Sequence, residues 1–397
     1  NVQYGQIEKI KEVAGVQEVI LENRYEPCVV KQEETADPNM ATSDKMIGSS
    51  AAWAAGYTGA GSRIAIIDTG TDVDHPSLDP DALKYALQGS NATIMTEADL
   101  TDEVLNQLNA YTRKAGLTAA DFYVNEKIPF GFNYVDADTD ITHDNDTQGD
   151  HGSHVTGIAA GNRFVKDEAG NYVAALDSVM TQGVAPDAQI LTMKVFGKRG
   201  GAYDSDYMVA IEDAMVLGAD AANLSLGGSF PGYSEYTEEK YRHILDEIVG
   251  SGMVVTISAG NSGSWFDQTA FGLPYAGSVN WATNGSPGSY VNSLCVASVD
   301  NAGVTDNYLK VKGHNMTYTE KSYQNKPIYT IGGSHEYIYL DKIGTAEEFA
   351  AVKDVLAGKI AICNRGDTSF YEKAEAAVAN GAIFPARTSL TAANSSA

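Results

Sequence analysis

The chain contains 397 residues, and its 43% apolar content is ample for more than one buried core. Acidic residues dominate, with 52 Asp and Glu against 27 Lys and Arg and a formal net charge of −25. Such a surface repels nucleic-acid phosphates and anionic lipid headgroups, so we expect neither as a partner, and no apolar run reaches the ~18 residues of a membrane-spanning helix.

The N-terminal 27 residues have the pattern of the end of a domain. Residues 6–27 predict a short amphipathic helix, a turn at Gly15 and a strand of alternating character. Residues 28–45 follow with the Glu, Asp, Pro and Ser composition of an exposed linker. Residues 1–20 lack a basic start followed by an apolar block, so either the protein is intracellular or its signal peptide lies outside this sequence.

From residue 63 onward, apolar runs alternate with helical segments. The runs are short, rich in β-branched or small residues and end in Gly or Asp, which predicts strands buried on both faces at residues 63–70, 188–197, 221–228, 252–260 and 293–300. Between them, residues 205–218 and 236–250 have helical spacing and a terminal Gly. This alternation predicts an α/β fold with a parallel, doubly wound sheet and helices on both faces.

Polar residues at the carboxyl ends of such strands are the first candidates for a site, because ligands bind there in open α/β sheets. Asp68 ends one strand, and alone it reads as a turn or helix cap. Asn261 follows another strand in a Gly-rich loop, where it is either a turn residue or a hydrogen-bond donor to a developing oxyanion.

Two histidines, His151 and His154, lie three residues apart in the segment HGSHVTGIAAG. Its small residues would let a helix pack closely on the sheet. The pair could also ligate a metal, but a helical zinc site needs a third ligand and a Glu beside the first His, which is absent here. We therefore predict no metal at this motif and keep a metallohydrolase only as a weaker alternative.

Taken in order, these motifs resemble the subtilisin family of serine peptidases, in separate blocks along residues 1–397. IAIIDTGTDVDHP resembles the family's aspartate motif, HGSHVTGIAAG its histidine motif, NLSLGG its substrate-lining strand and SAGNSG its oxyanion-asparagine motif. The resemblance implies that Asp68 orients His151, that His151 transfers the proton of a serine hydroxyl, and that Asn261 stabilises the oxyanion.

The same resemblance implies two strand edges that pair with an extended peptide substrate. Gly201 and Ala202 form one edge, and Ser225, Leu226 and Gly227 form the other. Glycine at such an edge lets another backbone approach closely. Residue by residue, ordinary strand-end turns explain these positions equally well, so only the whole set favours a substrate cleft.

The interval between Asp68 and His151 is longer than compact members of the family use, so we expect an insertion at about residues 91–148. It includes a helical pattern at 96–116 and an aromatic segment at 125–136 that resembles large lactocepin-like and C5a-peptidase-like cell-envelope peptidases. Residues 136–150 then carry six Asp without one Lys or Arg. Because the spacing fails the EF-hand pattern, we interpret this segment as a solvated acidic loop, with a structural calcium ion as the alternative. No cofactor is required.

Residues 301–397 no longer show the alternation of strands and helices that precedes them. Within them, residues 358–382 resemble part of the β-rich protease-associated domain that large subtilases carry as an insert. The resemblance thus divides the chain into the end of an inhibitory propeptide (1–27), a linker (28–45), an incomplete peptidase domain (46–300) and a partial insert domain (301–397). The family's Gly-Thr-Ser-x-Ala-x-Pro serine motif does not occur in this sequence.

We therefore expect a secreted or cell-envelope serine endopeptidase that acts on protein and peptide substrates and is inhibited by its own propeptide. Its nucleophilic serine should lie beyond these 397 residues, which leaves the chain as given inactive. The alternative is a non-catalytic binding protein that kept the fold and lost the nucleophile. A binding module has no need of all three motifs, which favours the peptidase.

Overall fold

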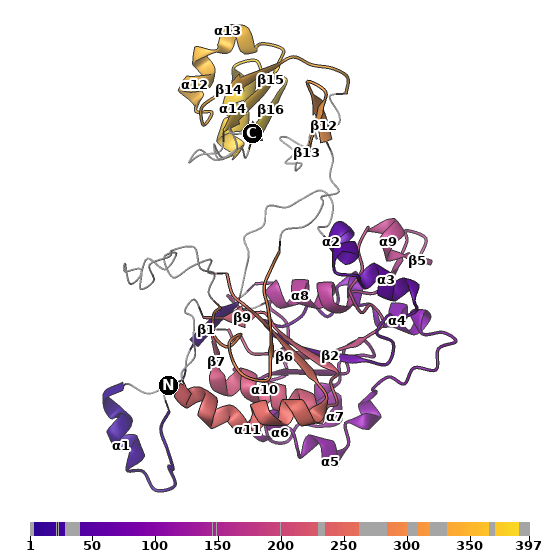
Figure 1. Ribbon diagram of the computed structural model, residues 1–397, viewed down its shortest axis with the longest axis vertical. Coiled ribbons are helices and arrows are strands. Elements are labelled where there is room, and N and C mark those ends of the chain that lie inside the picture. The colour runs from indigo at the N-terminus through magenta and orange to yellow at the C-terminus, as the bar shows by residue number, and fades with distance from the viewer. Residues whose placement is uncertain are drawn as a thin grey trace. The chain divides into compact units, whose positions relative to one another are not determined.

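The structure is a computed structural model (Figure 1). It describes residues 4–20, 22, 24–27, 40–144, 146–147, 149–198, 200–228, 235–261, 284–299, 308–317, 332–364 and 370–388. The chain divides into two compact units: Asn1–Gln32 with Asp37–Thr305, and Glu33–Ala36 with Asp306–Ala397.

The first unit is built on a six-stranded sheet in which all neighbouring strands are parallel. In spatial order the strands are β11 (Leu294–Val296), β10 (Val254–Ser258), β8 (Ala221–Leu224), β2 (Arg63–Asp68), β6 (Gln189–Lys194) and β3 (Phe130–Asn133). Spatial order departs from chain order, as a sheet wound in both directions requires. The α/β fold predicted from the sequence is confirmed.

Helices cover both faces of this sheet. Figure 1 shows α8 (His151–Ala160) on one side and α10 (Asp204–Val216) with α11 (Glu235–Ser251) on the other. The two predicted helices at 205–218 and 236–250 are therefore confirmed as α10 and α11.

The burial of the central strand β2 on both faces explains why its sequence is one apolar run. Ile66 joins the hydrophobic cluster beneath α8, whereas Ala65 and Ile67 join the larger cluster beneath α10 and α11. All three side chains are at most 1% exposed. Because successive side chains of a strand point to opposite faces, burial on both faces needs apolar residues at every position.

The sequence of α10 fits its place under the sheet. Asp204 and Asp206 lie in its first turn, where negative charge is favourable next to the helix N-terminus. Tyr207, Ile211 and Ala214 follow at a spacing that puts them on one face, and all three are buried.

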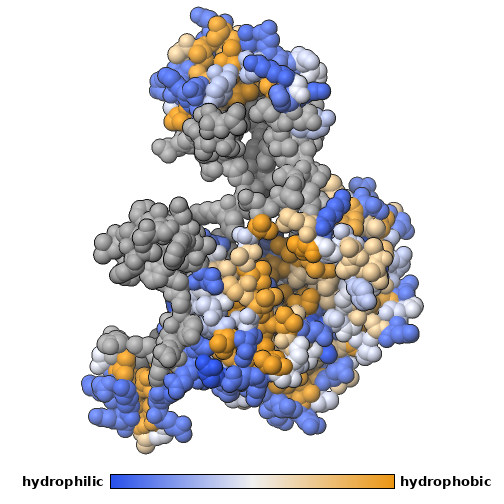
Figure 2. All heavy atoms as spheres, viewed as in Figure 1, coloured by the Kyte–Doolittle hydropathy of each residue, from blue (hydrophilic) through white to orange (hydrophobic). Residues whose placement is uncertain are grey.

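Strands β10 and β11 correct the expectation that every strand is buried on both faces. Val254 of β10 is 51% exposed, and Leu294 and Val296 of β11 are 56% and 48% exposed. Leu294 and Val296 lie two residues apart and therefore share one face of β11, and that face is uncovered in the structure as described. Figure 2 shows hydrophobic residues gathered at the surface of the first unit.

The prediction of one helix across residues 96–116 is also wrong, because the structure divides this segment into several short helices. The Thr101 side chain accepts a hydrogen bond from the backbone N–H of Val104, which caps a new helix in the middle of the pattern. The pieces here and just beyond are η3 (Glu97–Asp99), α5 (Asp102–Leu105), α6 (Asn109–Arg113) and α7 (Ala119–Phe122). The aromatic segment after them supplies β3, an edge strand of the main sheet.

Smaller elements complete the first unit. β1 (Arg24–Pro27), β7 (Ala202–Tyr203) and β9 (Leu226–Gly227) form a three-stranded sheet, and β4 (Phe164–Lys166) pairs with β5 (Tyr172–Ala174). The remaining helices are η1 (Tyr4–Gln6), α1 (Ile7–Lys11), α2 (Met40–Met46), α3 (Ser49–Ala54), η2 (Pro76–Leu78), α4 (Pro80–Ala86) and α9 (Ala175–Ser178).

The second unit has its own small core. Its parallel sheet runs β14 (Tyr337–Leu340), β15 (Ile360–Asn364) and β16 (Phe384–Thr388), with α12 (Ala346–Ala351), α13 (Lys353–Leu356) and α14 (Phe370–Ala379), and a separate hairpin joins β12 (Tyr308–Val311) to β13 (His314–Thr317). Leu340, Phe349 and Leu356 are among its buried residues. Its described elements are five strands and three short helices, and the assignment of this unit to a partial protease-associated domain stays a prediction.

Across the described ranges, no helix has the combined length and apolarity that crossing a membrane requires.

Candidate active site

The carboxyl edge of the main sheet gathers the residues that the sequence singled out. Asp68 is the last residue of β2, and Asn261 follows the end of β10 by three positions. Ser225 directly follows β8, the strand between them. Because these strands are parallel, their carboxyl ends lie at the same edge.

Asp68 and His151 contact each other directly at this edge. His151 Nδ1 lies 2.8 Å from Asp68 Oδ1, although the two residues are far apart in the chain. The aspartate side chain is fully buried and the imidazole is 13% exposed. The backbone N–H of Thr69 donates to the same Oδ1 at 2.7 Å, which fixes the carboxylate. Nδ1 of His151 thus contacts a carboxylate whose position is fixed by a backbone hydrogen bond.

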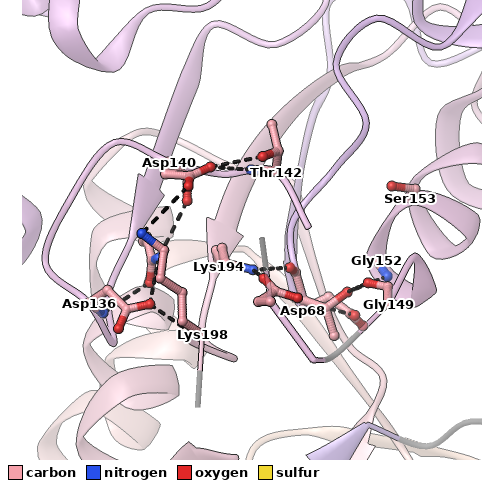
Figure 3. A network of polar contacts seen from close by, with 12 residues as sticks. Asp68, Asp136, Asp140, Thr142, Gly149, Gly152, Ser153, Lys194 and Lys198 are labelled. Atoms are coloured by element: carbon pink, nitrogen blue, oxygen red, sulfur yellow. Dashed lines mark hydrogen bonds and ion pairs between the residues drawn. The ribbon is translucent and has the colours of Figure 1, made fainter. Parts of the chain in front are cut away.

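The start of α8 is tied to the turn that follows β2. Thr69 Oγ1 accepts a hydrogen bond from the backbone N–H of Gly152 at 2.8 Å and donates to the carbonyl of Gly149 at 3.4 Å (Figure 3). The Ser153 hydroxyl accepts from the backbone N–H of Asp72 at 2.7 Å. These bonds set the position of His151, which opens the helix.

Close backbone contact at this junction needs glycine. A Cβ atom on Gly152 would lie 2.2 Å from the carbonyl oxygen of Gly70 and 3.1 Å from Asp68 Oδ1. Gly70 itself has a φ of +107°, and a Cβ there would lie 2.3 Å from the carbonyl oxygen of Ile141. The small residues of the histidine motif therefore serve close approach of α8 to the sheet.

Gly152→Ala should consequently destabilise the chain by about 1–3 kcal/mol, the usual cost of forcing atoms into a packed site. Gly157→Ala on the same helix is the matched control, because a Cβ there has no neighbour within 4 Å. Alanine at that helix position should leave the free energy of unfolding unchanged or raise it by up to ~1 kcal/mol. Urea unfolding of both variants measures this; equal stability of the two would contradict the proposed close packing.

A buried ion pair lies beside Asp68. Lys194 ends β6, where it pairs in register with Asp68, and its Nζ lies 2.6 Å from Asp146 Oδ2. Both side chains are almost fully buried, at 1% and 2% exposed. The same Nζ donates to the backbone carbonyl of Thr69. Lys194 therefore joins the turn after Asp68 to the segment that precedes His151.

The acidic segment 136–150 is only partly the solvated loop that the sequence predicted. Asp146 is a correction, because the ion pair with Lys194 buries it. Lys198 lies near two further carboxylates, 3.9 Å from Asp138 and 3.8 Å from Asp140 (Figure 3). Where the structure describes the chain, no group of three or more His, Cys, Asp or Glu residues is arranged to hold a metal ion.

Strand β1 lies between the two strand edges that the sequence assigned to substrate. Its first half pairs antiparallel with β7, joining Tyr25 to Ala202, and its second half pairs antiparallel with β9, joining Glu26 to Gly227 and Pro27 to Leu226. Three of the five predicted edge residues, Ala202, Leu226 and Gly227, thus pair with this strand. Gly201 lies close to it as well, since a Cβ atom built on Gly201 would be 2.2 Å from Arg24 Nε.

Two predicted site residues lie at the edge without a described contact to Asp68 or His151. Ser225 accepts a hydrogen bond from the Asn223 side chain at 3.1 Å and directly precedes β9. Asn261 follows Gly260, whose φ is +91°, and is exposed. The oxyanion role expected for Asn261 stays a prediction.

Sequence reasoning missed Lys194 and Tyr25. A lysine inside the apolar run AQILTMKVFG was the available signal, since a charge in a doubly buried strand needs a partner. Tyr25 carried no such signal, because its pairing with Ala202 joins distant parts of the chain.

Comparisons with known proteins agree with this geometry. The model of the subtilase family matches residues 59–382. The chain is 31% identical to the PIII-type proteinase of Lactococcus lactis subsp. cremoris over 95% of the chain and 18% of that protein. It is 29% identical to the minor extracellular protease Vpr of Bacillus subtilis over 91% of the chain and 35% of that protein.

It is also 27% identical to a C5a peptidase of Streptococcus pyogenes, over 82% of the chain and 25% of that protein. The chain therefore spans a third or less of the length of most of these relatives. A match to the family model along most of the chain, with the parallel sheet and the Asp68–His151 contact, leads to one conclusion: the chain belongs to the subtilase family.

Proposed function

We propose that the whole protein is a serine endopeptidase that hydrolyses peptide bonds in proteins with an Asp-His-Ser triad. The observation that carries this proposal is the 2.8 Å contact between Asp68 Oδ1 and His151 Nδ1 at the carboxyl edge of the sheet. A carboxylate held by backbone and aimed at one imidazole nitrogen leaves the other nitrogen to exchange protons with a nucleophile.

In this mechanism His151 donates its Nδ1–H to Asp68, which selects the tautomer with a free, basic Nε2. Nε2 accepts the proton of a serine hydroxyl as that oxygen attacks the substrate carbonyl, and then gives the proton to the leaving amine. Asp68 stays ionised and stabilises the imidazolium. The Asn261 amide donates to the oxyanion of the tetrahedral intermediate. A water molecule then attacks the acyl-enzyme in the same way: His151 takes its proton and returns it to the serine oxygen, which releases the carboxylic acid product without a cofactor.

The residues described so far do not supply the nucleophile of this mechanism. The sequence has no Gly-Thr-Ser-x-Ala-x-Pro motif, so we place the serine in a part of the whole protein outside the 397 residues. Residues 1–397 alone should then hydrolyse no protein. We further assign residues 301–397 to a partial protease-associated domain and the whole protein to the cell envelope or the extracellular space.

We also propose that residues 1–27 end an inhibitory propeptide whose last strand holds the place of a substrate. β1 supports this, because it completes a sheet with both predicted edges. Two acidic side chains attach the same segment to the helices beneath: Glu22 accepts from the N–H of Ser205 at 2.9 Å, and Glu18 forms an ion pair with Lys240.

Maturation should therefore cut the chain between Arg24 and Asp44. Intact-mass and N-terminal analysis of the full-length product measures the position of the cut. The His151→Ala variant is the control, since self-processing needs the proposed triad, and it should retain the N-terminal segment. A mature protein that begins at or before Asn1 would contradict this assignment.

Casein hydrolysis tests the proposed function itself. Full-length protein should release peptides from casein, and residues 1–397 expressed alone should not. Folded full-length protein that leaves casein and a mixed peptide library intact, even after an added protease has removed its N-terminal segment, would favour the non-catalytic alternative.

A further inference from the structure

The side chain of Tyr25 occupies a buried site of unusual chemistry. Tyr25 is the second residue of β1, and only 2% of it is exposed. Its phenol O–H donates to Asp204 Oδ1 at 2.9 Å, and its oxygen lies 3.3 Å from the hydroxyl oxygen of Tyr290. Its ring packs edge-on against the ring of Tyr207, with centroids 5.5 Å apart. We call Asp204, Tyr207, Gly228 and Tyr290 the Tyr25 site.

Asp204 is the polar centre of this site. It opens α10, is 0% exposed, and accepts a second phenol hydrogen bond from Tyr207 at 2.7 Å. A buried carboxylate is tolerated when donors surround it, and it is costly when one of them is removed. The phenol of Tyr25 is therefore part of what makes Asp204 acceptable inside the protein.

The surroundings also favour an uncharged phenol at this place. Burial, together with the negative charge of Asp204, raises the pKa of Tyr25 well above its usual range. The same two causes, with burial again the larger, raise the pKa of Tyr290. The Tyr25 site thus favours an uncharged hydroxyl group that donates a hydrogen bond to Asp204.

Tyr25 enters this site from a strand that lies where a substrate would. The backbone on both sides of it is held by β7 and β9, so the direction of its side chain is set by the strand pairing. Gly228, next to β9, lines the site: a Cβ there would lie 3.9 Å from two ring carbons of Tyr25. A peptide that replaces β1 would direct the equivalent side chain into the same place.

We infer that the Tyr25 site is a specificity site that selects peptide substrates carrying tyrosine at the position of Tyr25, with Asp204 as the residue that reads the phenol hydroxyl. This inference rests on the proposed function, because it takes β1 as the stand-in for substrate. Selection follows from hydrogen bonding: phenylalanine fills the same space but leaves the Asp204 carboxylate one donor short. Sites built to bond a hydroxyl discriminate strongly against analogues that lack it.

The test uses the mature full-length protein and a synthetic peptide of residues 16–27 as an inhibitor of casein hydrolysis. Three peptides are compared: the natural one, its Tyr25→Phe form and its Tyr25→Lys form. We expect the inhibition constant of the Phe peptide to be about 10- to 100-fold higher than that of the Tyr peptide, the range for a bond to a charged group. A Gln17→Ala peptide, changed at an exposed position, should inhibit as the natural peptide does.

The Asp204→Leu enzyme completes the comparison, because leucine keeps the shape and removes the acceptor. On it the Tyr and Phe peptides should inhibit equally, or the Phe peptide better. Equal inhibition by both peptides on the unchanged enzyme would overturn the inference, and this result does not depend on whether Asp204→Leu folds. Stronger inhibition by the Lys peptide, or a Tyr preference that survives Asp204→Leu, would overturn it as well.

Failure of the proposed function would look different. In that case mature protein hydrolyses no casein, whichever peptide is added, and the inference falls with it. Active enzyme without a Tyr preference refutes the Tyr25 site alone.

Discussion

Replacing His151 with alanine in the full-length protein should lower kcat/KM for peptide hydrolysis by about 10⁴-fold or more, since loss of the general base leaves only the oxyanion hole and substrate binding. The fold should survive, because the imidazole lies at the start of α8 and is partly exposed. Kinetics with a quenched fluorescent peptide, at matched folded concentrations, measure the change.

His154→Ala is the matched control for this experiment. His154 lies on the same helix, three residues further on, and is exposed. Its variant should keep activity close to the unchanged protein. Equal loss in both variants would instead point to a site that uses the two histidines together, as a metal site would. Full activity of His151→Ala would remove the histidine from the mechanism.

Lys194→Met should be the most destabilising of the substitutions considered, costing about 3–5 kcal/mol in the free energy of unfolding, because it leaves Asp146 buried without its cation. It also removes the donor to the Thr69 carbonyl, which adjoins Asp68. Urea unfolding of the chain measures the first effect. Peptide hydrolysis by the full-length variant should fall too, because the turn that carries Asp68 loses an anchor.

Lys198→Met is the control for Lys194, since both lysines face carboxylates of the acidic segment. Lys198 is 47% exposed and lies 3.8–3.9 Å from its partners, so its loss should cost no more than ~1 kcal/mol. Combining Lys194→Met with Asp146→Leu should restore part of the stability, because no unpaired charge is then buried. Similar small effects from both lysines would refute the structural role given to Lys194.

The sheet could be predicted from the sequence because its central strands are buried on both faces. Such burial demands continuous apolar runs, and β2 and β6 have them. The polar residue that ends β2 then marks the carboxyl edge, where parallel strands bring candidates together. The closeness of Asp68 and His151 came from the family resemblance, since no local pattern links residues so far apart.

What could not be predicted depends on contacts between distant segments. The family resemblance predicted that an extended strand pairs with the edge at Gly201 and Ala202, but the burial of Tyr25 against Asp204 leaves no periodic signal in either segment. The acidic segment looked solvated because its counterion, Lys194, belongs to another strand. The single helix expected at 96–116 failed for a local reason, because the capping role of Thr101 outweighed the helical spacing around it.

The most direct measurement of the central claim is labelling of the mature full-length protein with a fluorophosphonate, followed by peptide mapping of the modified residue. Such a probe reacts with a serine that a neighbouring histidine activates. The account predicts one modified serine outside residues 1–397, with labelling lost in His151→Ala after the unchanged protein has removed its N-terminal segment in trans, and retained in His154→Ala. Labelling that is absent from folded, mature protein, or that persists in full without His151, would contradict it.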